Sequence, residues 1–123
     1  MAARVARSGL DPFAWNHVFS IAFDMLHLLR RITGGLEERC GGSVVCRYAA
    51  RGALRSFIDA YYELEDGGCA AVGRFIETVD YVLRVINAIV AKHGADPELR
   101  RAIAVLRDLR VKLDAALASA CNA

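Results

Sequence analysis

The stretch from Val72 to Ala91 reads VGRFIETVDYVLRVINAIVA and decides the fold class. On a helix its apolar residues would occupy most of the circumference, whereas its polar residues recur every three or four positions and fall on one side. A helix that is apolar nearly all round has to be enclosed by other helices, so we predict a central helix here. The apolar residues are Val72, Phe75, Ile76, Val79, Val82, Leu83, Val85, Ile86, Ile89 and Val90, and the polar ones are Arg74, Glu77, Asp80, Arg84 and Asn87.

Prolines and glycines divide the rest of the chain into helices. Asp11-Pro12 and Asp96-Pro97 each place an N-cap residue before a proline at the first helical position. Glycine pairs at 34–35, 41–42 and 67–68, together with Gly94, indicate helix ends. These signals predict helices at 11–33, 43–65, 69–93 and 96–119, with an irregular turn across 34–42.

The length and composition fit one helical domain. The chain has 123 residues, of which 55% are apolar and 24% charged, enough to bury a core. It holds only two prolines and no alternating runs of β-branched residues, which argues against a sandwich or barrel. We predict an all-α, single-domain helical bundle over residues 1–123, in which a central hydrophobic helix at about residues 70–92 is surrounded by amphipathic helices.

The predicted first and last helices differ in their apolar surface. Segment 96–119 has a single apolar stripe, typical of an outer helix. Segment 11–33 carries more apolar side chains than one face can hold, which predicts either deep burial or an oligomer contact. These side chains are Phe13, Trp15, Val18, Phe19, Ile21, Phe23, Met25, Leu26, Leu28, Leu29 and Ile32.

Charge and hydropathy exclude several classes of partner. The net charge of +2 gives little long-range attraction for phosphate, so a dedicated nucleic-acid binder is disfavoured. Residues 1–10 are polar and basic, without the apolar segment of a secretory signal. Charged residues interrupt every long apolar stretch, which predicts that the chain has no membrane span. We expect a soluble, cytoplasmic protein.

The sequence has no pattern typical of a catalytic, metal or cofactor site. His17, Asp24 and His27 share a helix face, but the spacings of known metal-binding helices are missing, and solvated helix histidines are the ordinary interpretation. Glu63 and Glu65 lie with Asp66 at a predicted helix end, where solvated carboxylates need no catalytic role. We expect neither an enzyme nor a bound cofactor or metal.

The four cysteines leave two possibilities open. In an up-down bundle Cys69 would lie near Cys121, while Cys40 and Cys46 flank one loop. Bridges 40–46 and 69–121 are therefore geometrically possible in an oxidising compartment or a hyperthermophile cytosol. In an ordinary cytosol all four would be buried or free thiols, and this is the default expectation.

Three stretches together resemble a known family. Residues 52–67 read GALRSFIDAYYELEDG and are followed by VGRFI at 72–76, and upstream residues 29–36 read LRRITGGL. The first two resemble the first Bcl-homology region of the Bcl family of apoptosis regulators, and the third resembles its third homology helix. The resemblance covers about residues 29–90.

The chain departs from the Bcl pattern at several positions. Ala71 and Val72 replace the family's Asn-Trp, and the gap before Gly73-Arg74 is one or two residues longer. Gly34 stands where the ligand helix of the family has its acid, and no tryptophan marks the second homology region. The missing acid implies a receptor for death-motif helices rather than a ligand, similar to compact viral pro-survival members without a membrane tail.

The resemblance implies a helix-in-groove binding site. Arg74, next to Gly73, would pair with the acid of a death-motif helix from a pro-apoptotic protein, and apoptosis would be inhibited. Alternatively, Arg74 would form an ordinary surface pair with Glu77 or another nearby acid. Mitochondrial association would then come through the partners. The implied groove residues are Val72, Phe57, Ala60, Tyr61, Leu64, Ile76 and Tyr81.

A second hypothesis needs no groove. The protein would be a self-assembling helical bundle, a structural or interaction protein of a thermophilic archaeon or its virus. Its excess apolar surface would then form an oligomer contact, and the cysteines would be bridged. A homodimer is compatible with both hypotheses.

Overall fold

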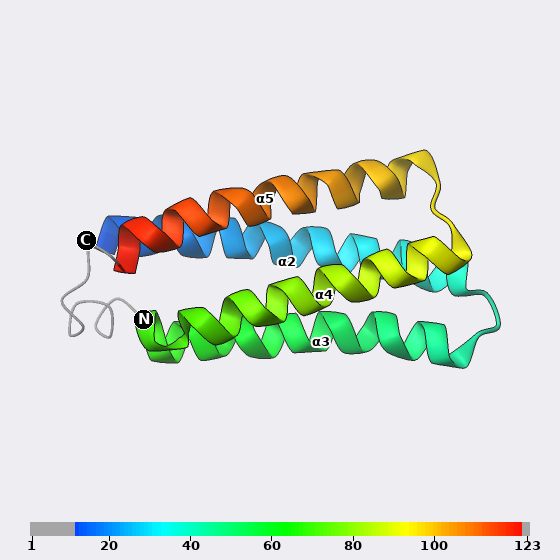
Figure 1. The fold of residues 1–123 in the computed structure, drawn as a ribbon, viewed down its shortest axis with the longest axis horizontal. Helices are drawn as coiled ribbons and strands as arrows, with labels where there is room; N and C mark the ends of the chain where they lie inside the picture. Colours follow the sequence, from blue (N-terminus) through cyan, green and yellow to red (C-terminus); the bar gives the residue numbers. More distant parts are fainter. Residues whose placement is uncertain (1–11, 122–123) are drawn as a thin grey trace.

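The computed structural model describes residues 12–121, which form an antiparallel helical bundle (Figure 1). In chain order the elements are α2 (Pro12–Cys40), α3 (Val44–Gly67), the short 3₁₀ helix η1 (Gly68–Ala71), α4 (Val72–His93) and α5 (Pro97–Cys121). The prediction of an all-α, single-domain bundle is confirmed. Residues 1–10 and the predicted N-cap Asp11 lie outside the described residues.

Most predicted helix ends are correct, and local chemistry explains them. The Ser43 side chain accepts a hydrogen bond from the Cys46 backbone N–H and caps α3. Asp96 caps α5, because its Oδ1 accepts from the Leu99 backbone N–H at 2.7 Å. Gly94 ends α4 with a φ of 77°, a conformation that glycine adopts without strain.

The break predicted at Gly34-Gly35 is wrong, because α2 continues to Cys40. The buried residues Ile32, Leu36 and Cys40 extend its apolar face past the glycines. Gly35 also lets α5 approach closely, since a Cβ added there would come within 3.2 Å of Leu99 Cδ1. Tertiary packing therefore outweighs the cost of two glycines in a helix, about 1 kcal/mol each.

Substitution by alanine should change the free energy of unfolding differently at the two glycines. A Cβ added at Gly34 would meet nothing within 4 Å, so Gly34→Ala should raise the free energy of unfolding by about 0.5–1 kcal/mol. Gly35→Ala should bring no such gain, because the new methyl group presses on buried Leu99. Urea unfolding of both variants measures this difference, and an equal gain at both positions would contradict the close packing at Gly35.

The helix with the most extensive tertiary packing is α2, not α4. α2 packs against α3, α4 and α5, whereas α4 packs chiefly on α3. The excess apolar surface of the first helix is thus mainly buried within the bundle. The enclosure predicted for α4 is met in part: five of its side chains are buried, while Val72, Ile76, Leu83, Val85 and Val90 pack against the core only half-buried.

Two disulfides tie the ends of the bundle. Cys40–Cys46 closes the loop between α2 and α3, and Cys69–Cys121 joins η1 to the last turn of α5. The antiparallel path brings the start of α4 and the end of α5 to the same end of the molecule (Figure 1). These are the two pairings that the up-down arrangement makes possible, and the default expectation of free thiols is wrong.

Candidate functional site

Three residues of the predicted groove floor lie inside the core. Phe57 and Leu64 are completely buried on α3, and Ala60 between them is buried as well. Phe57 packs against Phe75 of α4, with ring centroids 5.6 Å apart. In this closed packing, α3 and α4 would have to separate before a partner helix could touch these three side chains.

The remaining predicted groove residues lie nearer the surface of α3 and α4. Tyr61, Val72 and Ile76 are half-buried, and Tyr81 is exposed. The ring of Tyr61 packs edge-on against Phe19, and burial, followed by the negative charge of Glu65, raises the pKa of its phenol. Tyr61 is therefore a neutral packing residue rather than an acid–base group at ordinary pH.

Arg74 is one of the most exposed residues of the predicted site, and Gly73 beside it is exposed too. The Arg74 side chain is 76% exposed, and its guanidinium lies 3.6 Å from the Glu63 carboxylate of α3. This is the surface pair that the alternative interpretation of Arg74 anticipated, although the acid is Glu63 rather than Glu77. Such an exposed pair stabilises the fold little.

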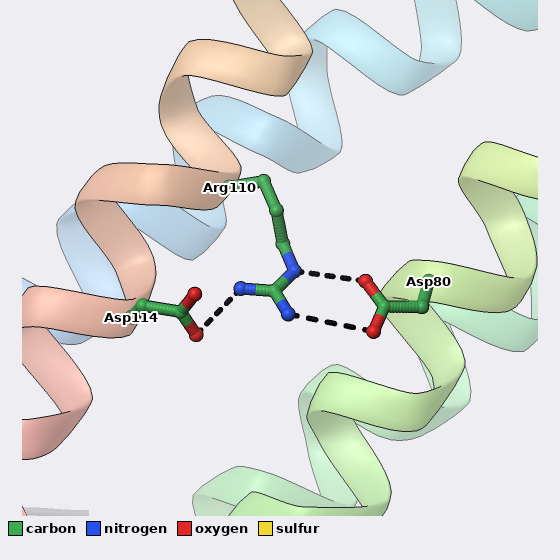
Figure 2. Close-up of polar contacts among 3 residues, drawn as sticks. All are labelled: Asp80, Arg110 and Asp114. Carbon is green, nitrogen blue, oxygen red and sulfur yellow. Dashed lines mark hydrogen bonds and ion pairs between the residues drawn. The ribbon is translucent and has the colours of Figure 1, made fainter.

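A more buried ion cluster links α4 to α5, and Figure 2 shows its three members. The Arg110 side chain is 16% exposed, and its guanidinium donates from Nε and Nη2 to the two carboxylate oxygens of Asp80, at 3.0 and 3.4 Å. Its Nη1 lies 2.5 Å from Asp114, an ion pair without good hydrogen-bond geometry. Burial acts to lower the pKa of Arg110, but the hydrogen bonds to Asp80 and the negative charges of Asp80 and Asp114 outweigh it and raise the pKa.

The position of this cluster indicates a structural role. Among the helix pairs of the bundle, α4 and α5 make few backbone approaches, and long side chains span the seam between them. Arg107 donates to Asn87 Oδ1 at 2.6 Å on the same seam. Arg110 was not among the predicted site residues, and its seven-residue spacing from Ile103 on the apolar stripe of α5 was the available signal.

Arg110→Met should lower the free energy of unfolding by about 1–2 kcal/mol, because it removes charge-assisted hydrogen bonds that are partly shielded from water. The matched Arg107→Met change, on an exposed pair, should cost less than about 0.5 kcal/mol. Urea unfolding near neutral pH measures both values. Because the folded pKa of Arg110 is raised, its contribution is complete below the ordinary arginine pKa and is lost only as pH rises through the folded value. Equal costs for the two variants would contradict a stabilising role for the Arg110 ion cluster.

Shallow hollows lie along the outer seam between α2 and α5. His17 and Asp24 border one hollow with Lys112, and Asp24 and His27 border the next with Val105. His27 packs edge-on against Phe23 at a centroid distance of 4.4 Å. Within residues 12–121, no group of three histidine, cysteine or acidic side chains is placed to hold a metal ion.

Exposed apolar side chains gather on α3. Val44, Val45 and Tyr48 stand at 68%, 81% and 79% exposure on the first turns of the helix, next to the Cys40–Cys46 bridge. Tyr62 is 61% exposed farther along the same helix. Large apolar groups held in water on a rigid helix are typical of a protein contact surface.

Comparison of the chain with protein-family models, with curated protein sequences and with solved structures gave no match. The resemblance to the Bcl family therefore rests on the motifs in the sequence alone. None of the helices within residues 12–121 is long and apolar enough to pass through a membrane.

Proposed function

We propose that this protein is an assembly module, a disulfide-tied helical bundle that works by binding another copy of itself. The observation that carries the proposal is the set of exposed side chains on α3: Val44, Val45, Tyr48 and Tyr62. Burying such side chains against a partner contributes about 1.5–3 kcal/mol for each one that becomes fully covered. The core beneath them is complete without a partner, so binding needs no rearrangement of the bundle.

The two bridges support a protein of an oxidising or hot environment. Intracellular disulfides are common in hyperthermophiles and rare in ordinary cytosols. A structural or interaction protein of a thermophilic archaeon or its virus fits this setting. The bridges also keep the ends of the helices together, which holds the α3 surface in one shape for binding.

Light scattering on the oxidised protein tests self-assembly. From 1 to 200 µM the mass should rise from that of one chain, 13.4 kDa, to twice that value. A mass of one chain over the whole range would overturn the proposal.

The groove receptor for pro-apoptotic death-motif helices is the second candidate. Its support is the exposed guanidinium of Arg74, which shares a helix face with exposed Tyr81 seven residues later. The test is titration with a helical peptide carrying the pattern Leu-x-x-x-Gly-Asp. Binding that weakens at least tenfold in Arg74→Ala would support the receptor, and no binding at high micromolar peptide would remove it.

A further inference from the structure

The charges of α3 are separated along its length. From Val44 to Ser56 the helix carries three arginines and no acid, and from Phe57 to Gly67 it carries four acids and no base. This order opposes the helix dipole, which favours acids near the N-terminus and bases near the C-terminus. The helix has no acid in its first turn and no base in its last turn. The charge order therefore does not serve the stability of α3 itself.

Neighbouring helices neutralise only part of this charge. Arg51 pairs with Glu37 of α2, and Glu63 pairs with Arg74 of α4. Arg55 and Asp59, in the middle of α3, are exposed and make no ion pair with any residue in the described part of the chain. One positive and one negative group thus remain available, one turn apart.

The two available charges, Arg55 and Asp59, lie on one outward stripe of α3. Its members are spaced three or four residues apart, so they follow one side of the helix, and all are exposed. Gly52 beside the stripe leaves open space, since a Cβ added there would meet nothing within 4 Å. We call this set the α3 stripe: Val44, Tyr48, Arg51, Arg55, Asp59, Tyr62 and Asp66.

We infer that two copies of this chain pair through the α3 stripe with their α3 helices antiparallel. A twofold axis near the middle of the stripe places the basic half of each helix against the acidic half of its partner. Arg55 then faces Asp59 of the partner helix, and each Tyr48 lies within about one helical turn of the partner's Tyr62. Parallel pairing would instead oppose like charges along the whole length. The inference rests on the proposed self-assembly and names its surface.

Charge reversal with rescue tests the inference by sedimentation equilibrium of the oxidised protein. Arg55→Glu and Asp59→Arg should each weaken the dimer at least tenfold, because each places like charges across the axis. The two changes together restore opposite charges between the copies, so the double variant should return to within threefold of the original dissociation constant. Arg101→Glu, on the exposed face of α5, is the matched control and should change nothing.

The possible outcomes distinguish the claim of self-assembly from the claim that the copies pair through the α3 stripe. A protein that stays monomeric without any substitution overturns both self-assembly and the α3 surface. A dimer that none of the single reversals weakens overturns the surface and leaves self-assembly standing. Weakening by both reversals without rescue in the double variant overturns the antiparallel arrangement. Unchanged far-ultraviolet circular dichroism shows that the variants fold, which their exposed positions lead us to expect.

Discussion

Phe57→Ala is expected to lower the free energy of unfolding by about 3–5 kcal/mol, the cost typical of emptying a phenylalanine site in a core. Phe57 is fully buried and packs on Phe75, so the change leaves a cavity between α3 and α4. In a domain of this size the loss corresponds to a drop in Tm of about 10–20 °C. Thermal and urea unfolding give the two values.

The matched control for Phe57 is Tyr81→Ala, another residue of the predicted groove. Tyr81 is 46% exposed, so its truncation should cost less than about 1 kcal/mol. If instead Phe57→Ala unfolded like the unsubstituted protein, Phe57 would have to lie on an accessible surface, as the groove hypothesis requires.

Removing the Cys69–Cys121 bridge should be the other large effect. The bridge joins residues 52 positions apart, and a loop of that length restricts the unfolded chain by about 4 kcal/mol. Changing both cysteines to alanine should therefore lower the free energy of unfolding by roughly that amount. The paired change at Cys40 and Cys46, whose loop spans 6 positions, should cost about 2 kcal/mol.

Unfolding under non-reducing conditions compares the two bridge variants. Treating the unsubstituted protein with dithiothreitol should also lower its free energy of unfolding, since reduction removes both bridges. A larger loss for the short loop than for the long one would contradict a structure in which Cys69–Cys121 ties η1 to the end of α5.

The sequence predicts helix ends well where a single side chain or glycine defines them. Ser43, Asp96 and Gly94 act through contacts within a few residues, which a pattern can reveal. Gly34-Gly35 could not be predicted as helical, because the compensating contact comes from Leu99, far away in the chain. The pairing of the cysteines could be predicted from the sequence, because topology alone brings Cys69 and Cys121 together. Whether the cysteines are oxidised could not be predicted in this way.

The periodicity of the sequence also did not show which helix packs most extensively against the others. The apolar circumference of α4 indicates how much of its surface can be buried, but α2 is the helix with the most extensive packing against its neighbours. The site was predicted less well, because Phe57 and Leu64 of α3 fit a groove floor and a core equally well in sequence. The charge order of α3 is visible in the sequence, yet its significance depends on which side of the helix faces outward.

Cross-linking between copies that carry an introduced cysteine at different positions tests antiparallel pairing through α3 most directly. The Tyr48→Cys and Tyr62→Cys variants each carry one free thiol beside the native bridges, and the two positions lie about 20 Å apart along one helix. Treated with a short bis-maleimide, an equal mixture of the two variants should yield cross-linked dimer, whereas either variant alone should yield little. Efficient cross-linking of the Tyr48→Cys variant to itself would contradict this arrangement.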